Sequence, residues 1–97
     1  MDIAKKTEGG RTVISVTGRV DTTTAPELDA GLKLEGTETL TLDLSGVPYM
    51  SSAGLRCLLT AQKTMMAGGG SMTIVGVQLA VREVLDITGF SGILTLA

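Results

Sequence analysis

Positions 39–59 read TLTLDLSGVPYMSSAGLRCLL, and the spacing of apolar residues changes inside this stretch. In its first half leucine alternates with polar residues, which is the pattern of a strand with one buried face. After Pro48 the apolar residues recur every three or four positions, as on a helix with one buried face. We therefore expect a strand over 39–47, a turn at Pro48, and a helix from Ser52 to about Met66.

The remaining sequence repeats this alternation of strands and helices. We expect strands over 3–7 and 12–17, joined by a tight turn at Gly9 and Gly10, because such turns need positive φ angles. MTIVGV (72–77) and GILTLA (92–97) are predicted as two further strands. The expected packing face of the helix after Ser52 consists of Leu55, Leu58, Leu59, Ala61, Met65 and Met66.

Two more helices are marked by the residues that begin and end them. The first follows Asp21, with Thr23 or Thr24 as its cap, Pro26 in its first turn and Gly36 at its end. The other covers about 77–88, and the glycine at position 89 is expected to end it in a left-handed conformation.

The predicted order is β-β-α-β-α-β-α-β. It describes an α/β fold with a mostly parallel sheet of about five strands, an opening antiparallel hairpin and three helices. Functional groups of such folds gather in loops at the carboxyl ends of parallel strands. Here those loops are residues 18–24 and 45–52.

Composition limits the classes of function. The chain has 97 residues, which fits a single domain over 1–97, and a net charge of −2 with scattered basic residues, so we expect no nucleic-acid partner. No apolar run is long enough to span a bilayer and the first residues lack a signal segment, so we expect a cytoplasmic protein with no membrane insertion.

The chain has no histidine and one cysteine, which argues against an enzyme. A Ser-His nucleophile, a disulfide within the chain and a cysteine-cluster metal site are all excluded. Cys57 lies in an apolar helical pattern and is expected to be a core residue. A nucleophile at Ser52 or Cys57, assisted by Asp21 or Asp43, is the enzyme alternative.

The adjacent serines 51 and 52 admit two interpretations. A serine that begins a helix commonly accepts a hydrogen bond from a free backbone N–H, and Ser51 suits that role. Ser52 would then be the first helical residue, with its hydroxyl directed outward. A phosphate there would meet the positive end of the helix, and Arg56 lies four residues later on the same face.

The stretch DLSGVPYMSSAGLRCLLTAQKTM resembles the signature of the STAS domain, in particular of bacterial anti-sigma factor antagonists. TGRVDTTTAPEL and VREVLDITGF resemble two further segments of that family. The resemblance places Ser52 at the family's phosphoacceptor position and Asp21 at the position of its loop acid. Ser51 stands where the family often has Asp, and the sequence ends at Ala97, where members usually continue into another helix.

The resemblance implies a binding module that needs no cofactor of its own. Unphosphorylated, it would bind an anti-sigma factor that is also a serine kinase, and so release a sigma factor. The kinase, which brings ATP and Mg²⁺, would phosphorylate Ser52 and end the binding, and a serine phosphatase would reset it. The expected partner-binding residues are Asp21, Thr22, Thr23, Met50, Ser51, Gly54, Leu55 and Arg56.

The sequence also admits other interpretations. Asp21 is equally well explained as the cap of the first helix. The chain could instead be a STAS subunit of a membrane lipid transporter, or another STAS interaction module whose serine is not modified. An interaction domain that binds a nucleotide in the same loops lacks support, because the glycine run 68–70 follows a helix and does not lead into one.

Overall fold

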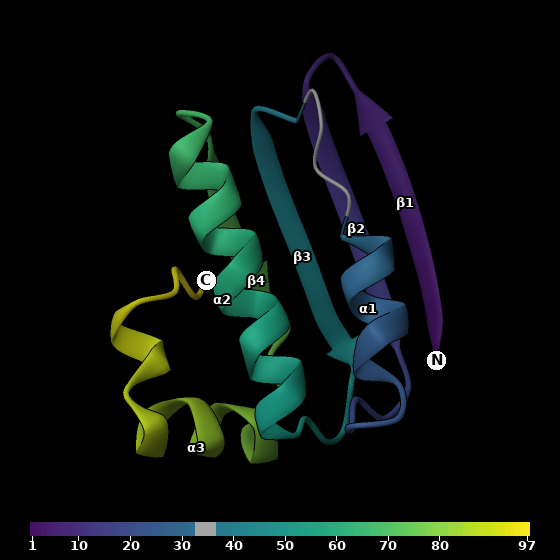
Figure 1. The fold of residues 1–97 in the computed structure, drawn as a ribbon, viewed down its shortest axis with the longest axis vertical. Coiled ribbons are helices and arrows are strands. Elements are labelled where there is room, and N and C mark those ends of the chain that lie inside the picture. Colours follow the sequence, from purple (N-terminus) through teal and green to yellow (C-terminus); the bar gives the residue numbers. More distant parts are fainter. Residues whose placement is uncertain (33–36) are drawn as a thin grey trace.

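A computed structural model of the protein describes residues 1–32 and 37–97 (Figure 1). The strands and helices are β1 (Asp2–Glu8), β2 (Arg11–Thr17), α1 (Ala25–Gly31), β3 (Thr39–Gly46), α2 (Ser52–Ala67), β4 (Ser71–Val75) and α3 (Leu79–Thr88), followed by a 3-10 turn, η1 (Phe90–Gly92).

The strands form one mixed sheet in the order β1-β2-β3-β4. β1 is antiparallel to β2, whereas β2, β3 and β4 are parallel to one another. In Figure 1, α1 and α2 cover one face of this sheet and α3 lies across its end. This arrangement confirms the α/β fold with an opening antiparallel hairpin and three helices.

The hairpin between β1 and β2 has the predicted turn. Gly9 and Gly10 both have positive φ angles, 55° and 83°, which residues with a Cβ adopt at a cost. The turn brings Glu8 opposite Arg11 and continues in register to Asp2 opposite Thr17.

Aliphatic side chains between the sheet and the helices form the core. The alternation that predicted β3 is confirmed, because Leu40, Leu42 and Leu44 have no exposed surface. From the opposite layer, Leu28 of α1 and Leu58 of α2 are equally buried. Burial of each such side chain contributes about 1.5–3 kcal/mol.

Among residues 1–32 and 37–97 the sheet has four strands, so the prediction of a fifth over 92–97 was wrong. The tail meets β4 at one bridge, where the Ile74 N–H donates to the Thr95 carbonyl (2.9 Å) and the Ala97 N–H donates to the Ile74 carbonyl (2.9 Å). Gly92 belongs to the 3-10 turn η1, which leaves too few extended residues to form a ladder. Leu94 is nevertheless buried, so the tail closes part of the core.

The helices agree with the prediction at the start of α1 and the end of α3 and differ from it at Met66. α1 begins at Ala25 with Pro26 in its first turn, as expected, and extends to Gly31; the predicted end at Gly36 lies outside the described residues. Met66 was placed on the packing face of α2 but is 66% exposed. Gly89 ends α3 with φ 80°, as predicted.

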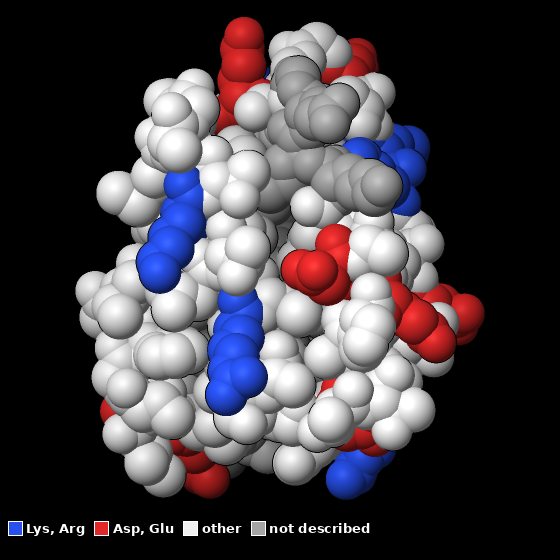
Figure 2. All heavy atoms as spheres, in the orientation of Figure 1, with Lys and Arg blue, Asp and Glu red and all other residues white. Residues whose placement is uncertain are grey.

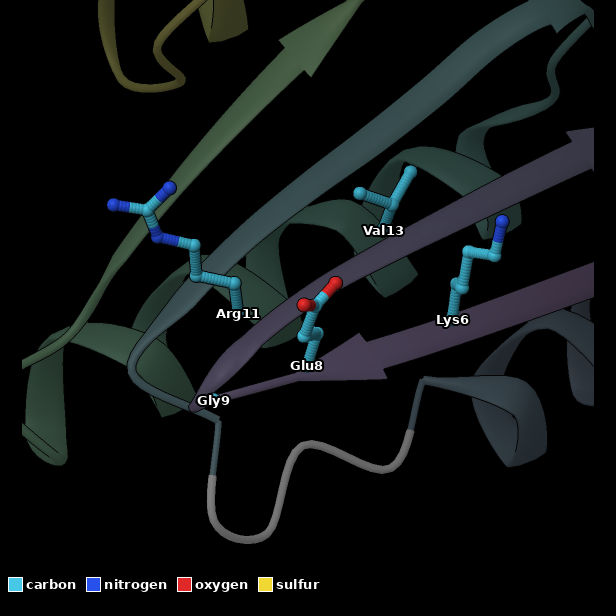
Figure 3. A pocket seen from close by; sticks show the side chains of 5 residues that line it. All are labelled: Lys6, Glu8, Gly9, Arg11 and Val13. Carbon is cyan, nitrogen blue, oxygen red and sulfur yellow. The ribbon is translucent and has the colours of Figure 1, made fainter.

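The sheet face opposite α1 and α2 carries short and charged side chains. Lys6, Glu8, Arg11 and Val13 project from that face and line a hollow of about 500 Å³ (Figure 3). This hollow lies near the β1–β2 turn, at the edge where the parallel strands begin. It is therefore at the opposite edge of the sheet from the loops that carry the predicted site.

Candidate functional site

The two predicted loops lie side by side at the edge where the parallel strands end. Val20, after β2, forms a parallel bridge with Met50, after β3. The Val20 N–H donates to the Tyr49 carbonyl (3.0 Å), and the Ser51 N–H donates to the Val20 carbonyl (2.8 Å). These two bonds fix the start of α2 against the first loop.

The two serines at the start of α2 have different roles. Ser51 is the N-cap, with an extended backbone, and its hydroxyl accepts a hydrogen bond from the Gly54 N–H at 3.4 Å. Ser52 is the first residue of the helix and is exposed. Its hydroxyl has no hydrogen-bond partner among the residues that the structure describes. The capping task therefore falls to Ser51 and leaves the Ser52 oxygen accessible.

Three other predicted site residues, Met50, Gly54 and Leu55, are buried. Met50 and Leu55 are each 2% exposed and belong to the core. A Cβ added to Gly54 would lie 2.6 Å from Val20 Cγ1 and 2.7 Å from Met50 Cγ. Gly54 thus allows the close approach of α2 to both loops. Met50, Gly54 and Leu55 support the turn that carries Ser51 and Ser52, which we call the serine turn, but they do not form its outer surface.

Asp21 caps the turn that leads into α1. Its Oδ1 accepts hydrogen bonds from the backbone N–H groups of Thr23 (2.9 Å) and Thr24 (3.0 Å) and from the Thr24 hydroxyl (3.2 Å). The Thr24 hydroxyl in turn accepts one from the Asp21 N–H (2.9 Å). Thr24, one of the two predicted caps, is the N-cap residue of α1, although its side chain makes no capping hydrogen bond. Asp21 instead accepts backbone N–H groups in the turn just before the helix.

These hydrogen bonds lower the pKa of Asp21 below its ordinary value. The Thr24 backbone N–H has the largest effect, and the partial loss of solvation opposes it. The Thr23 N–H, the Thr24 hydroxyl and the Arg19 guanidinium lower the pKa further. Asp21 is therefore an ionised side chain with a fixed orientation.

Arg19 and Tyr49 also belong to the candidate site, although no sequence pattern singled them out. The Arg19 guanidinium carbon lies 4.1 Å from the centre of the Tyr49 ring, in a cation–π contact. Arg19 Nε is also 3.6 Å from Asp21 Oδ2. Tyr49 is 40% exposed and the Arg19 side chain 64% exposed. Their place at the ends of neighbouring strands, beside the serine pair, is the signal that could have identified them.

The outer residues of the site lie in the two loops and at the start of α2. Thr22, Thr23, Ser52 and Arg56 are exposed and Ser51 is half-buried. With Arg19 and Tyr49 they make up a candidate docking surface, called the docking surface below. Thr22 and Arg56 both line a groove of about 370 Å³ between α1 and α2. Figure 2 shows basic side chains over α2 and acidic side chains over α1, on either side of this groove.

Cys57 is buried at the base of that groove, as predicted for a core residue. It is 8% exposed, and its thiol donates to the Ala25 carbonyl at 3.5 Å. Burial, followed by the nearby Asp29 carboxylate, raises the pKa of the Cys57 thiol. A protonated, buried thiol is a poor nucleophile.

The acidic residue of the DLS motif has a local structural role. Asp43 Oδ1 accepts a hydrogen bond from the Ser45 N–H (2.9 Å), which lowers the pKa of Asp43. The Ser45 carbonyl accepts one from Gln78 Nε2 (2.8 Å), which ties the end of β3 to the start of α3. The motif therefore shapes the end of the strand from which the serine turn departs.

A family model described as "Mlab, STAS domain" matches residues 3–95. The chain belongs to the STAS domain family.

Relatives of this STAS domain include anti-sigma factor antagonists. The chain is 33% identical over 91 residues to BtrV of Bordetella bronchiseptica, named as an anti-sigma factor antagonist, covering 91% of this chain and 78% of the relative. It is 31% identical over 84 residues to an anti-sigma-B factor antagonist of Staphylococcus epidermidis, covering 84% and 78%. Both names describe proteins that antagonise an anti-sigma factor.

Solved structures of anti-sigma factor antagonists have the same fold as this chain. An anti-sigma factor antagonist from Mycobacterium paratuberculosis superposes with a TM-score of 0.86 at 26% identity, over 98% of this chain and 83% of that one. The antagonist SpoIIAA in its unphosphorylated form has a TM-score of 0.81 at 17% identity, over 99% and 88%. At that identity, the second likeness concerns the fold alone.

Within residues 1–32 and 37–97, every helix is too short or too polar to cross a lipid bilayer.

Proposed function

We propose that this STAS domain is an anti-sigma factor antagonist that is switched off by phosphorylation of Ser52. The unphosphorylated docking surface binds an anti-sigma factor with serine kinase activity, and that binding releases a sigma factor. The kinase then phosphorylates Ser52 with its own ATP and Mg²⁺, and a serine phosphatase removes the phosphate. The names of the relatives support the general function.

One observation carries the proposal: the exposed Ser52 hydroxyl stands free beside a serine that already caps the helix. Because Ser51 satisfies the capping bond, a phosphate on Ser52 breaks no hydrogen bond among the described residues. The phosphate also meets the positive end of α2, a favourable place for an anion. Phosphorylation is therefore compatible with an intact fold, and a protein with this fold, SpoIIAA, exists in a phosphorylated form.

The phosphate acts on the interface because of its charge. It adds about 1.5–2 negative charges at one point of the docking surface. A partner that covers this point must remove water from the dianion without supplying a counter-charge, which costs a few kcal/mol. Each 1.4 kcal/mol weakens binding about tenfold, so a loss of about 100-fold is expected.

The test measures binding of the unphosphorylated chain to its anti-sigma factor and the release of the sigma factor. Ser52→Asp should weaken binding strongly. Ser52→Ala should bind like wild type and stay bound when ATP is added. Ser51→Ala is the matched control: it loses a cap worth about 1 kcal/mol of stability but keeps the switch. Equal binding by wild type and Ser52→Asp would refute the proposal.

A second candidate follows from the family model, whose description names Mlab and not an antagonist. In that case the chain is a STAS subunit of a membrane lipid transporter, or another STAS interaction module, and Ser52 is part of a contact that is never phosphorylated. A pull-down with the tagged chain from its own cells discriminates the two. Recovery of a transporter ATPase without a kinase favours the second candidate.

A further inference from the structure

Arg19 is held in place from two sides, although it is largely exposed. One face of its guanidinium stacks on the Tyr49 ring at 4.1 Å, and its Nε lies 3.6 Å from Asp21 Oδ2. A long surface side chain normally loses rotamer freedom when a partner binds, which weakens the complex. Arg19 has lost part of that freedom before any partner arrives.

The groups that hold Arg19 are themselves fixed. Asp21 Oδ1 accepts three hydrogen bonds from Thr23 and Thr24, so its other oxygen keeps its direction toward Arg19. The Tyr49 backbone carbonyl accepts the Val20 N–H, and the next residue in the chain, Met50, is buried. Arg19 and Tyr49 are thus a preorganised pair of side chains at the rim of the docking surface.

The terminal nitrogens of Arg19 remain available to a partner. No acceptor for them is present among the described residues, and the side chain is 64% exposed. A guanidinium offers parallel N–H donors in one plane, an arrangement that matches the two oxygens of a carboxylate. Arginine and tyrosine are also enriched among the residues that dominate binding energy at protein interfaces.

We propose that Arg19, stacked on Tyr49, determines partner specificity by binding an Asp or Glu carboxylate of the anti-sigma factor. This inference rests on the proposed function, because it concerns the same docking surface. A carboxylate fits better than a phosphate, because Asp21 already places one negative charge 3.6 Å from Arg19 Nε. A single further charge is repelled less than a dianion. Arg19 would bridge Asp21 and the partner's carboxylate.

Arg82 provides a matched control elsewhere on the surface. It also pairs with an aspartate through Nε, at 3.3 Å from Asp86 Oδ1, and its side chain is 50% exposed. It lies on α3, outside the docking surface. Arg82→Gln therefore removes the same charge and the same kind of ion pair as Arg19→Gln, without changing the site.

The experiment measures the dissociation constant for the anti-sigma factor by calorimetry at about 50 mM and about 300 mM salt, since salt screens exposed charge pairs. Arg19→Gln should bind about tenfold more weakly than wild type at low salt and lose much of the salt dependence. Arg19→Lys keeps the charge but lacks the planar fork, and should lie between the two. Arg82→Gln should bind like wild type. Urea unfolding of every variant separates weakened binding from a weakened fold.

Three results would overturn the inference. Arg19→Gln could bind as tightly as wild type, or it could bind more weakly by the same factor at both salt concentrations. Arg19→Lys could bind as tightly as wild type, which would remove the role of the planar fork. A wild-type chain that does not bind the anti-sigma factor at all would instead refute the proposed function, so the two failures can be told apart.

Discussion

Gly54 provides a direct test of how tightly α2 packs on the two loops. In Gly54→Ala the new Cβ would lie 2.6 Å from Val20 Cγ1 and 2.7 Å from Met50 Cγ. Val20 is completely buried and Met50 is 2% exposed, so neither side chain can move into solvent. Overpacking of this kind costs about 1–3 kcal/mol.

The helix itself gains from the same substitution, because alanine is favoured over glycine in helices by up to about 1 kcal/mol. We therefore expect a net loss of about 1–2 kcal/mol in the free energy of unfolding. The corresponding fall in melting temperature is about 4–8 °C for each kcal/mol in a domain of this size. Because Val20 also bonds the Ser51 N–H, its displacement should weaken partner binding as well.

Urea unfolding followed by circular dichroism measures this loss, and Gly68→Ala is the matched control. Gly68 follows α2 with φ −86°, and the nearest atom to an added Cβ is 3.7 Å away. Gly68→Ala should therefore keep wild-type stability. If Gly54→Ala unfolds at the same or a higher urea concentration than wild type, the contact between α2 and the loops is not as rigid as described.

Two further predictions concern titratable groups. The lowered pKa of Asp21 means that its stabilising effect is present above the unfolded-state value of about 3.9 and is lost as the pH falls through the folded-state value. Asp21→Asn should therefore be less stable than wild type at neutral pH, and the difference in urea midpoint should shrink below about pH 4; a constant difference would contradict the capping role. Burial raises the pKa of Cys57, so iodoacetamide should label it far more slowly in the native protein than in urea. Rapid labelling of the native protein would restore Cys57 as a candidate nucleophile.

Periodicity predicted most of the sheet and the two long helices. The alternating leucines of β3 can bury one face only as a strand, and the spacing from Leu55 to Met65 can do so only as a helix. The glycines at 9, 10 and 89 were predictable for a different reason, since each stands where the chain needs a positive φ angle.

The closing segment shows the limit of this reasoning. GILTLA has the alternation of a strand, yet a strand also needs a partner edge along its whole length. Gly92 lies in the 3-10 turn η1 and is not extended, and only the segment around Leu96 pairs with β4. Local pattern contains no information on how far a tail extends along an edge.

The candidate site also contains residues whose place could be predicted from the sequence and residues whose place could not. The helical spacing already placed Leu55 on the packing face, so its burial follows from the pattern that predicted α2. Contact between Arg19 and Tyr49 does not follow from any local pattern, because the two residues are 30 positions apart. It depends on how the ends of β2 and β3 are aligned, which only the three-dimensional structure shows.

Phosphate mapping tests the central claim most directly. The chain is incubated with its kinase-type anti-sigma factor and ATP, and the modified residue is located by tandem mass spectrometry. We predict one phosphate per chain, on Ser52, and none in the Ser52→Ala variant. Phosphate on Ser51 or Thr22, or no phosphate on a chain that binds the kinase, would contradict the account.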